Sequence, residues 1–280
     1  MEIRYGANKS DAAGYSTERL RDEFLIENMY RPDEVAAVYS HADRVVVLGI
    51  MPVNESVPID RGMDAGKMFG TKYFLERREA GIFNIGGSGS IVAGGRKYSM
   101  EFQDCLYVSK GTEDVIFASD NASEPAKFYA VSAPAHHAYE TTHIPIKSSV
   151  KKALGSAENS NSRVIHQFIH PDVLKTCQLC MGLTVMDSGN VWNTMPCHTH
   201  ERRMEVYTYF GMSDGGAVFH FMGEASQTRH LVVQNEQAVI SPSWSIHAGC
   251  GTADYRFIWA MAGENMEFQD MDAIGNTDLR

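Results

Sequence analysis

The stretch "MPCHTHERRMEVY", Met195 to Tyr207, places two histidines one residue apart and a glutamate shortly after them. Side chains two positions apart on a strand point to the same face, so His198 and His200 can reach one ion together. The separation from His200 to Glu205 is odd, and Glu205 can therefore join them only across a turn, a bulge or a curved strand. We interpret these three side chains as metal ligands.

A fourth ligand is expected from a distant strand. The segment "ISPSWSIHAGCG" offers His247 beyond a turn that begins at Pro242. Together, the HxH pair, the following glutamate and the PxxxxH turn resemble the two sequence motifs of the cupin superfamily. Trp244 stands where cupins usually carry the glycine of the second motif, so the shape of this turn is expected to differ.

Composition excludes several classes of protein. The 280 residues are 44% hydrophobic and 21% charged, which is typical of a globular protein. The net charge of −10 argues against binding of nucleic acid or an anionic membrane. The chain lacks the apolar run of a membrane span and the pattern of a signal peptide, so we expect a cytoplasmic protein. The five cysteines are interpreted as reduced thiols, and the CxxC at Cys177 and Cys180 as structural.

Strand signals dominate the chain. Two segments favour a helix: "STERLRDEFLIENMY", capped by Ser16, and the short "HPDVLKT" from His170. The remainder consists of short β-branched or aromatic runs separated by Gly, Asp and Asn, which predicts a sandwich or barrel. Examples are "RVVVLGIMPV", "GIFNIGG", "DVIFAS", "KFYAVSAP", "GAVFHFMG" and "YRFIWAMAG".

The two halves of the chain resemble each other. "LERREAGIFNIGGSG" from Leu75 aligns with "HERRMEVYTYFGMSDG" from His200, and "DCLYVSKGTED" then occupies the place of "QAVISPSWSIH". A repeat of this kind indicates two copies of one β-domain. We predict an all-β bicupin of two jelly-roll barrels with a few short helices, divided into residues 1–150 and 151–280. Residues 147–163, rich in Ser, Asn and Lys, are interpreted as the linker.

Only the second copy carries the ligands. The alignment puts Tyr73, Leu75, Ala80 and Asp114 at the positions of His198, His200, Glu205 and His247. The predicted N-terminal domain is therefore cupin-like without a metal site. In the C-terminal domain, three histidines and one carboxylate leave room for a substrate oxygen or water, as in catalytic sites. This donor set suits zinc, iron(II), manganese or nickel alike.

Nearly the whole chain resembles the 5-keto-4-deoxyuronate isomerase family, the 4-deoxy-L-threo-5-hexosulose-uronate ketol-isomerases of bacterial pectin breakdown. "YSHADRVVVLGIMPV", "WNTMPCHTHERRMEVY", "ISPSWSIH" and "MDAIGNTDLR" carry the resemblance. It implies one zinc ion per subunit on His198, His200, Glu205 and His247, a bicupin fold and a homohexamer. It also implies conversion of the uronate to 3-deoxy-D-glycero-2,5-hexodiulosonate.

The expected reaction moves a proton from C2 to C1 through an enediolate that a Lewis-acidic metal can stabilise. Glu201, Glu205 or a hydroxide on the metal could carry the proton. The substrate is an acidic sugar, and Arg202 and Arg203 are candidates to bind its carboxylate, although strand alternation points one of them away. The remaining candidates for the pocket wall, which could equally be plain core, are Tyr207, Trp192 and Trp244.

Three other functions remain open at this point. An iron-dependent cupin dioxygenase would use the same ligands and consume oxygen. A sugar-acid binding or regulatory protein would use the pocket without turnover, and a storage bicupin would not need the ligands at all. We hypothesise a metal-dependent ketol-isomerase in uronate catabolism, because that reading also accounts for the whole-chain resemblance.

Overall fold

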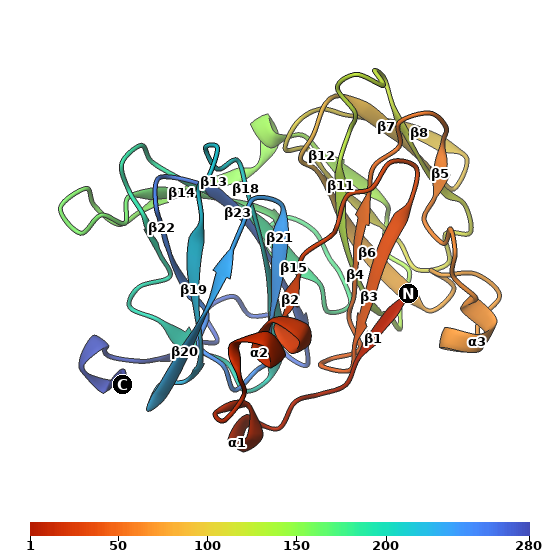
Figure 1. The fold of residues 1–280 in the computed structure, drawn as a ribbon. Coiled ribbons are helices and arrows are strands. Elements are labelled where there is room, and N and C mark those ends of the chain that lie inside the picture. Colours follow the sequence, from red (N-terminus) through yellow and green to blue (C-terminus); the bar gives the residue numbers. More distant parts are fainter. The chain divides into compact units, whose positions relative to one another are not determined.

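The computed structural model describes residues 1–280, which form two compact units. Unit 1 comprises residues 1–4, 28–149 and 171–179, and unit 2 comprises residues 5–27, 150–170 and 180–280. Each unit is built mainly of strands, as Figure 1 shows, and the predicted all-β class is confirmed. The chain passes between the units more than once, because residues 5–27 belong to unit 2 and residues 171–179 to unit 1.

Unit 1 contains a seven-stranded and a four-stranded sheet. Across the larger sheet lie β1 (Glu2–Arg4), β3 (Val35–Ser40), β4 (Val46–Ile50), β11 (Phe128–Pro134), β6 (Arg78–Asn84), β9 (Cys105–Val108) and β12 (Thr142–Ile144). Across the smaller sheet lie β5 (Val57–Pro58), β10 (Val115–Ser119), β7 (Gly89–Ala93) and β8 (Arg96–Met100). Its helical elements are α3 (Ala65–Phe69) and the 3₁₀ turn η1 (Ile146–Ser148).

Unit 2 has the same pair of sheets and a third, two-stranded one. Across its larger sheet lie β13 (Val150–Leu154), β14 (Arg163–Ile169), β15 (Cys180–Met186), β23 (Arg256–Gly263), β18 (Arg203–Phe210), β21 (Gln237–Ser241) and β2 (Leu25–Ile26). The four-stranded sheet contains β16 (Trp192–Asn193), β22 (Ala248–Gly251), β19 (Val218–Glu224) and β20 (Gln227–Val233). The small sheet pairs β17 (His198–Thr199) with β24 (Asp272–Ala273). The helical elements are α1 (Lys9–Ala12), α2 (Thr17–Phe24) and the 3₁₀ turn η2 (Asn276–Asp278).

The two units share strand order and register. In unit 1, β6 lies between β11 and β9, and in unit 2, β18 lies between β23 and β21. Ala80 of β6 pairs with Val108, whereas Glu205 of β18 pairs with Ser241. These are the pairs that the sequence alignment of the two halves places at equivalent positions. Ala80 of unit 1 therefore occupies the strand position that Glu205 occupies in unit 2.

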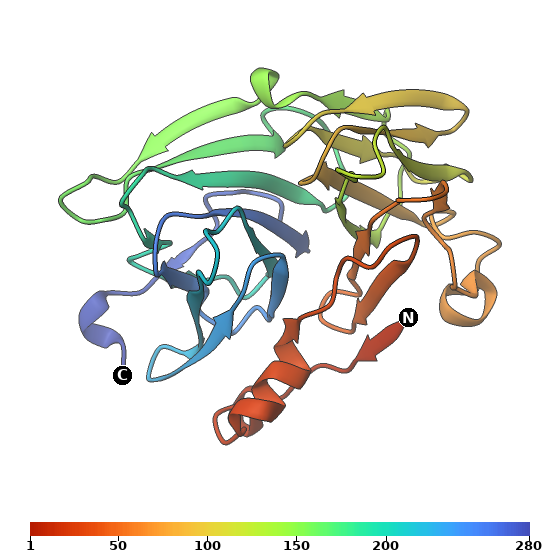
Figure 2. The ribbon, with the colours of Figure 1, turned by 45° about the horizontal axis from the view of Figure 1, so that its top comes forward.

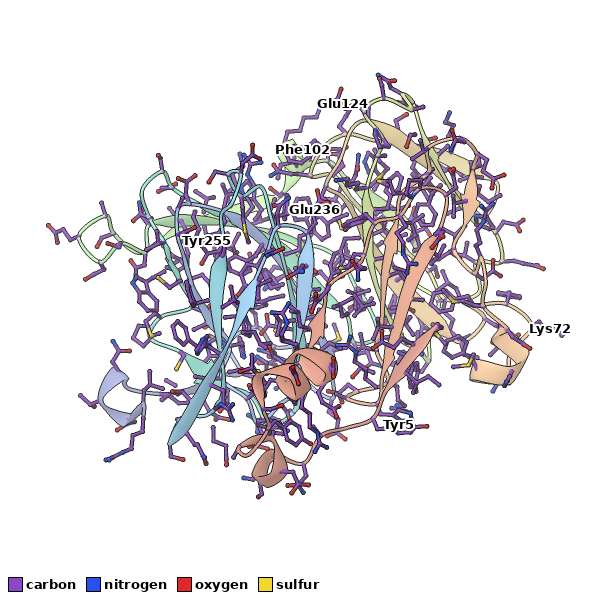
Figure 3. The ribbon with its side chains drawn as sticks, viewed as in Figure 1. Tyr5, Lys72, Phe102, Glu124, Glu236 and Tyr255 are labelled. Atoms are coloured by element: carbon purple, nitrogen blue, oxygen red, sulfur yellow. The ribbon has the colours of Figure 1, made fainter.

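The interiors of the two units differ in chemistry. The core cluster of unit 1 consists mainly of aliphatic and phenylalanine side chains such as Phe117 and Phe128, with Tyr98 as its buried tyrosine. The core cluster of unit 2 contains more buried tyrosines, among them Tyr255. Figure 3 shows Tyr255 among the strands of unit 2, while the exposed Lys72 projects away from unit 1. Buried tyrosine hydroxyls need hydrogen-bond partners, so the interior of unit 2 must also contain polar groups.

The local predictions are partly confirmed. The helix capped by Ser16 forms as α2, with the Ser16 hydroxyl accepting the Arg19 amide. It ends at Phe24 because the next two residues pair with β21 instead. The helix predicted from His170 is wrong: residues 171–173 form only a turn. The linker prediction for residues 147–163 is wrong in part, since β13 lies inside it and pairs with β14. In Figure 2, β13 is the green strand at one edge of the larger sheet of unit 2.

Gly182 of β15 is a position where a side chain has no room. A Cβ built on Gly182 would lie 2.1 Å from Cζ2 of Trp259 and 2.6 Å from the carbonyl oxygen of His166. We expect Gly182→Ala to lower the free energy of unfolding by about 1–3 kcal/mol through overpacking, measured by urea denaturation. Gly6→Ala, where nothing lies within 4 Å of the added methyl, is the control. Equal stability of both variants would contradict this packing.

Candidate metal centre

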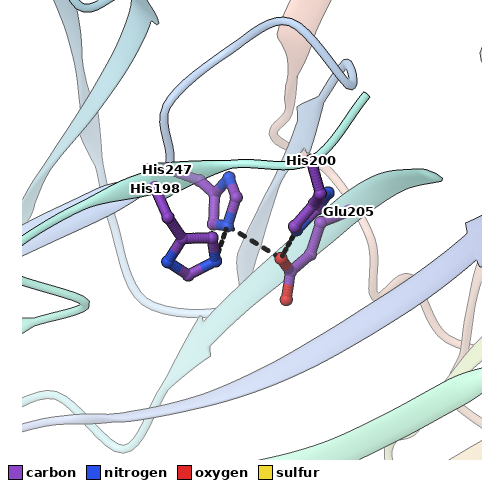
Figure 4. A group of neighbouring side chains, drawn as sticks. All are labelled: His198, His200, Glu205 and His247. Carbon is purple, nitrogen blue, oxygen red and sulfur yellow. Dashed lines mark hydrogen bonds and ion pairs between the residues drawn. The ribbon is translucent and has the colours of Figure 1, made fainter. Parts of the chain in front are cut away.

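Four side chains from three places in unit 2 converge on one point (Figure 4). His198 lies on β17, which is held by pairing of His198 with Ala273 of β24. His200 follows two residues later, and Glu205 projects from β18. His247 comes directly before β22, after the turn in which the Ser245 amide donates to the Pro242 carbonyl. The two predicted motifs therefore meet in space.

The donor atoms lie close together. Nε2 of His247 is 2.9 Å from Oε2 of Glu205 and 3.0 Å from Nε2 of His198. Nε2 of His200 is 3.2 Å from the same carboxylate oxygen. All four ligand atoms lie within 4.8 Å of one another, which is a spacing that one ion can bridge.

Hydrogen bonds at the other ring nitrogens fix two of the imidazoles. Nδ1 of His200 lies 2.9 Å from the carbonyl oxygen of Arg203, and Nδ1 of His247 lies 3.3 Å from that of Ser245. A carbonyl oxygen only accepts, so each Nδ1 carries a hydrogen, and each ring in its neutral form presents a bare Nε2 lone pair. Both lone pairs point at the Glu205 carboxylate. Acceptors facing acceptors are unfavourable unless a proton or cation lies between them, so these residues fit a bound cation.

The charge states at the cluster favour the same interpretation. Burial raises the pKa of Glu205, but the neighbouring His247 and His200 outweigh burial and leave the pKa below its usual value. Burial, with the charge of His247, lowers the pKa of His198 to about 3. At neutral pH the cluster therefore offers an ionised carboxylate and an uncharged imidazole, the forms that bind metals.

A group of hydrogen-bonded polar side chains lies next to the cluster, where Tyr207 contacts His247. The hydroxyl of Tyr209 lies 2.7 Å from Nδ1 of His220, and the hydroxyl of Ser241 lies 3.5 Å from its Nε2. The hydroxyl of Tyr207 lies 3.1 Å from Oγ1 of Thr194. Burial raises the pKa of Tyr207 and Tyr209 well above the ordinary value, so both stay protonated and can donate.

A cavity of about 230 Å³ opens over the cluster. It is smaller than the roughly 300–1,000 Å³ of sites for drug-sized ligands, which suits one small molecule. His198 and Glu205 belong to its wall, together with polar, cationic and aromatic side chains. The other lining residues are Leu154, Arg163, Ile165, Thr184, Thr194, Pro196, Arg203, Tyr207, Phe257, Trp259, Met261, Phe268 and Met271.

Arg203 lines this cavity, but backbone carbonyls occupy its guanidinium. Nη1 donates to the carbonyl of Glu267 at 2.6 Å, and Nη2 donates to those of Phe268 and Asp270 at 3.2 and 3.1 Å. The equivalent Arg78 of unit 1 is also buried and donates to backbone carbonyls. Arg203 is therefore placed to hold the segment of residues 267–270 beside the site.

Two other predicted residues lie away from the cavity wall. Arg202 is exposed and forms a bidentate pair with Asp270, with N–O distances of 2.6 and 2.5 Å. Glu201 is also exposed. The structure therefore does not bring Arg202 or Glu201 to the ligands, even though both directly follow His200 in the sequence.

The predicted aromatic residues separate into two groups. Tyr207 lines the cavity. Trp192 instead stacks on Phe221, with ring centroids 5.7 Å apart, and Trp244 packs edge-on against Phe24 of α2 at 6.3 Å. Neither tryptophan belongs to the cavity wall. Trp244, where cupins carry a glycine, is thus used in packing.

Sequence reasoning missed several cavity residues. Arg163 begins β14, and Phe257 and Trp259 lie on β23. No motif spacing connects these strands to the HxH segment. The one available signal is that β23 alternates inward-facing aromatic residues in "YRFIWAM".

Comparison with known proteins places the chain among characterised relatives. The sequence model of the KduI/IolB family matches residues 30–275. The chain belongs to the KduI/IolB family. It is 52% identical over 280 residues to a 4-deoxy-L-threo-5-hexosulose-uronate ketol-isomerase of Halalkalibacterium halodurans and 52% identical to one of Escherichia coli O127:H6. Each comparison covers 100% of this chain and 100% of the relative.

Solved structures of proteins with much lower sequence identity have a similar fold. An IolB-like protein from Salmonella typhimurium LT2 matches with a TM-score of 0.70 at 13% identity, over 90% of this chain and 96% of that one. Oxalate decarboxylase of Bacillus subtilis, which has Mn(II) centres, matches with a TM-score of 0.53 at 10% identity, over 81% and 71% of the two chains. Likeness at these identities shows the fold. No helix of the chain is long and apolar enough to cross a membrane.

The buried His220 predicts a pH dependence of stability. Burial, with the charge of His247, lowers the pKa of His220 to about 3, whereas an unfolded histidine titrates near 6.5. Between these values the unfolded chain binds one more proton, so stability is lost as the pH falls below about 6.5, at up to about 1.4 kcal/mol per pH unit. In metal-free protein, His220→Gln should unfold in urea with a shallower dependence on pH than wild type. Parallel profiles from pH 7 to 4 would contradict this.

Proposed function

We propose that this chain is a metal-dependent ketol-isomerase. Its substrate would be 4-deoxy-L-threo-5-hexosulose uronate (5-keto-4-deoxyuronate), and its product 3-deoxy-D-glycero-2,5-hexodiulosonate. The observation that carries the proposal is the convergence of His198, His200, Glu205 and His247. Two of them, His198 and Glu205, line a cavity for one small molecule. The full-length identity to relatives named for this reaction supports the choice of substrate.

His198, His200, Glu205 and His247 would hold one divalent ion per subunit. Zinc is the proposed metal, and iron(II), manganese and nickel accept the same ligands. When bound, the ion supplies a Lewis acid that stabilises negative charge on the substrate oxygens at C1 and C2. The carbonyls of Arg203 and Ser245 would keep Nε2 of His200 and His247 free for the ion.

Isomerisation requires a base that removes the C2 proton and returns it to C1. The second proton moves from the C2 hydroxyl to the C1 oxygen, so the reaction needs no oxidant or reductant. Glu205 is the carboxylate on the cavity wall, and its Oε1 makes no hydrogen bond in the protein. In Figure 4 this oxygen points away from the imidazoles. We assign Glu205 as the proton carrier in preference to the exposed Glu201.

Tyr207 would donate a hydrogen bond to a substrate oxygen. Its hydroxyl forms a hydrogen bond with the Thr194 hydroxyl, and both residues line the cavity. Burial keeps this hydroxyl protonated across the neutral range. Such a donor gains strength as negative charge develops on the enediolate, because the cavity excludes much of the water.

The proposed function extends to the two domains, the cellular location and the assembly. We interpret the two units as two cupin copies, of which unit 2 supplies the chemistry and unit 1 is a domain without metal ligands. The units differ from the predicted division into residues 1–150 and 151–280 in that residues 5–27 and Val150 belong to unit 2 and residues 171–179 to unit 1. The enzyme would act in the cytoplasm, in pectin and uronate catabolism, as a homohexamer. The family resemblance alone supports the location and the assembly.

Turnover with and without chelator tests the proposal. Purified protein should convert 5-keto-4-deoxyuronate to the diulosonate, followed by NMR, and a chelator should abolish conversion until zinc is restored. His198→Ala and His247→Ala should each lower kcat/KM by at least about 10³-fold, because each removes a ligand to the ion that stabilises the charge. Conversion that neither the chelator nor the two substitutions reduce would contradict the role of the metal. Oxygen uptake in place of isomerisation would favour a dioxygenase.

The role of Tyr207 is tested by removing one oxygen atom. Tyr207→Phe should lower kcat by roughly 10- to 100-fold, the loss typical of one donor to a developing oxyanion, while zinc content stays unchanged. Metal analysis and steady-state kinetics measure the two effects. A kcat within twofold of wild type would show that this hydroxyl serves packing only.

A further inference from the structure

The cavity wall includes one arginine whose guanidinium has a single hydrogen-bond partner in the protein. Of the lining residues, only Arg163 and Arg203 are always charged positively. Arg203 is buried and donates to three backbone carbonyls, as described above. Arg163 makes a single hydrogen bond, from Nη1 to the carbonyl of Asn161 at 2.7 Å, and no ion pair. Its remaining N–H groups are therefore available to a ligand.

Arg163 faces the same interior as the metal ligands. Residues two apart on a strand share a face, so Arg163 and Ile165 of β14 point the same way, as do Tyr209 and Glu205 of β18. Cross-strand pairing connects these faces rung by rung. The row runs through Ile165, Thr184, Phe257 and Tyr209.

The guanidinium lies among apolar and phenolic side chains. Burial lowers the pKa of Arg163, and the nearby hydroxyls of Tyr207 and Tyr255 partly restore it. The surrounding wall is largely apolar, with Leu154, Phe257 and other hydrophobic side chains. A partly desolvated cation without a counter-charge is costly to hold, and an anion entering the cavity would offset that cost. A partly buried charged group with a shifted pKa in a cavity is a candidate for a ligand site.

Arg163 and Glu205 line different parts of the same cavity wall. The strand of Arg163 is three steps from β18 in the sheet order, and the cross-strand row through Ile165 reaches β18 at Tyr209, four residues from Glu205. In 4-deoxy-L-threo-5-hexosulose uronate, the carboxylate is at C6, the opposite end from the reacting C1 and C2. A cation across the cavity from Glu205 can hold C6 while C1 and C2 lie at the ligand cluster.

We propose that Arg163 binds the substrate carboxylate through a bidentate pair and thereby selects uronates over neutral sugars. This inference rests on the proposed function for the identity of the substrate. It replaces Arg202 and Arg203, since the former pairs with Asp270 and the latter with carbonyls. Arg163 is a binding and positioning residue, and Glu205 remains the group that moves the proton.

The test compares Arg163→Gln with Arg163→Lys in zinc-loaded protein. Arg163→Gln should raise KM for 5-keto-4-deoxyuronate roughly 10- to 100-fold, with a much smaller change in kcat. The KM of Arg163→Lys should lie between the values for wild type and Arg163→Gln, because an ammonium keeps the charge and loses the bidentate geometry. Lys151→Gln is the matched control: it removes the same charge from an exposed position on β13, outside the cavity wall.

Calorimetry with methyl glycosides, which have no free aldehyde to isomerise, separates binding from turnover. Methyl α-D-galacturonoside should bind wild type at least about tenfold more tightly than Arg163→Gln, whereas methyl α-D-galactoside should bind both equally. Arg163-dependent binding of the uronate without any turnover would keep this inference and overturn the reaction. Turnover by wild type with an unchanged KM in Arg163→Gln would overturn this inference alone. If Arg163→Gln and Arg163→Lys lower kcat and the unfolding midpoint to the same extent, Arg163 has a structural role, and that result would also overturn this inference.

Discussion

The site depends on the repulsion among acceptors that the fold forces together. Nε2 of His200 and His247 both face the Glu205 carboxylate, and backbone carbonyls at the far side of each ring accept from Nδ1, which leaves Nε2 for a proton or a metal ion. A proton or a metal ion between these groups turns the cluster from a cost into a stabilising interaction. The strands, turns and buried polar side chains of unit 2 can be understood as the framework that holds these acceptors in place against that cost.

The two units have the same fold, but only unit 2 contains the cluster of acceptors. They share strand order, pairing register and a buried arginine that donates to backbone carbonyls. Where unit 2 has Glu205, unit 1 has Ala80, within a core of mainly phenylalanine and aliphatic side chains. A carboxylate needs partners in the interior, whereas a methyl group needs only contact. The polar side chains around His220 therefore accompany the ligands in unit 2.

Much of the candidate site could be predicted from sequence because its four side chains lie at motif spacing. The HxH pair with Glu205 and the PxxxxH turn indicate the same four side chains that the structure brings together, and the short β-branched runs predicted an all-β fold. Neighbours in sequence were a poor guide to the substrate contacts: strand alternation and a tight turn send Arg202 and Glu201 outwards. Arg163 approaches the cavity only through cross-strand pairing over three strands, which no local pattern records. Likewise, β13 was hidden in a polar segment because its residues are exposed and carry no hydrophobic signal.

The central claim is that one ion sits among these four side chains. The most direct measurement is anomalous X-ray diffraction at the zinc edge from crystals of the zinc-loaded protein. The account predicts one anomalous peak per chain, about 2.0–2.2 Å from Nε2 of His198, His200 and His247 and from a carboxylate oxygen of Glu205. A peak held by other residues, or zinc-loaded protein with no density among these four, would contradict it.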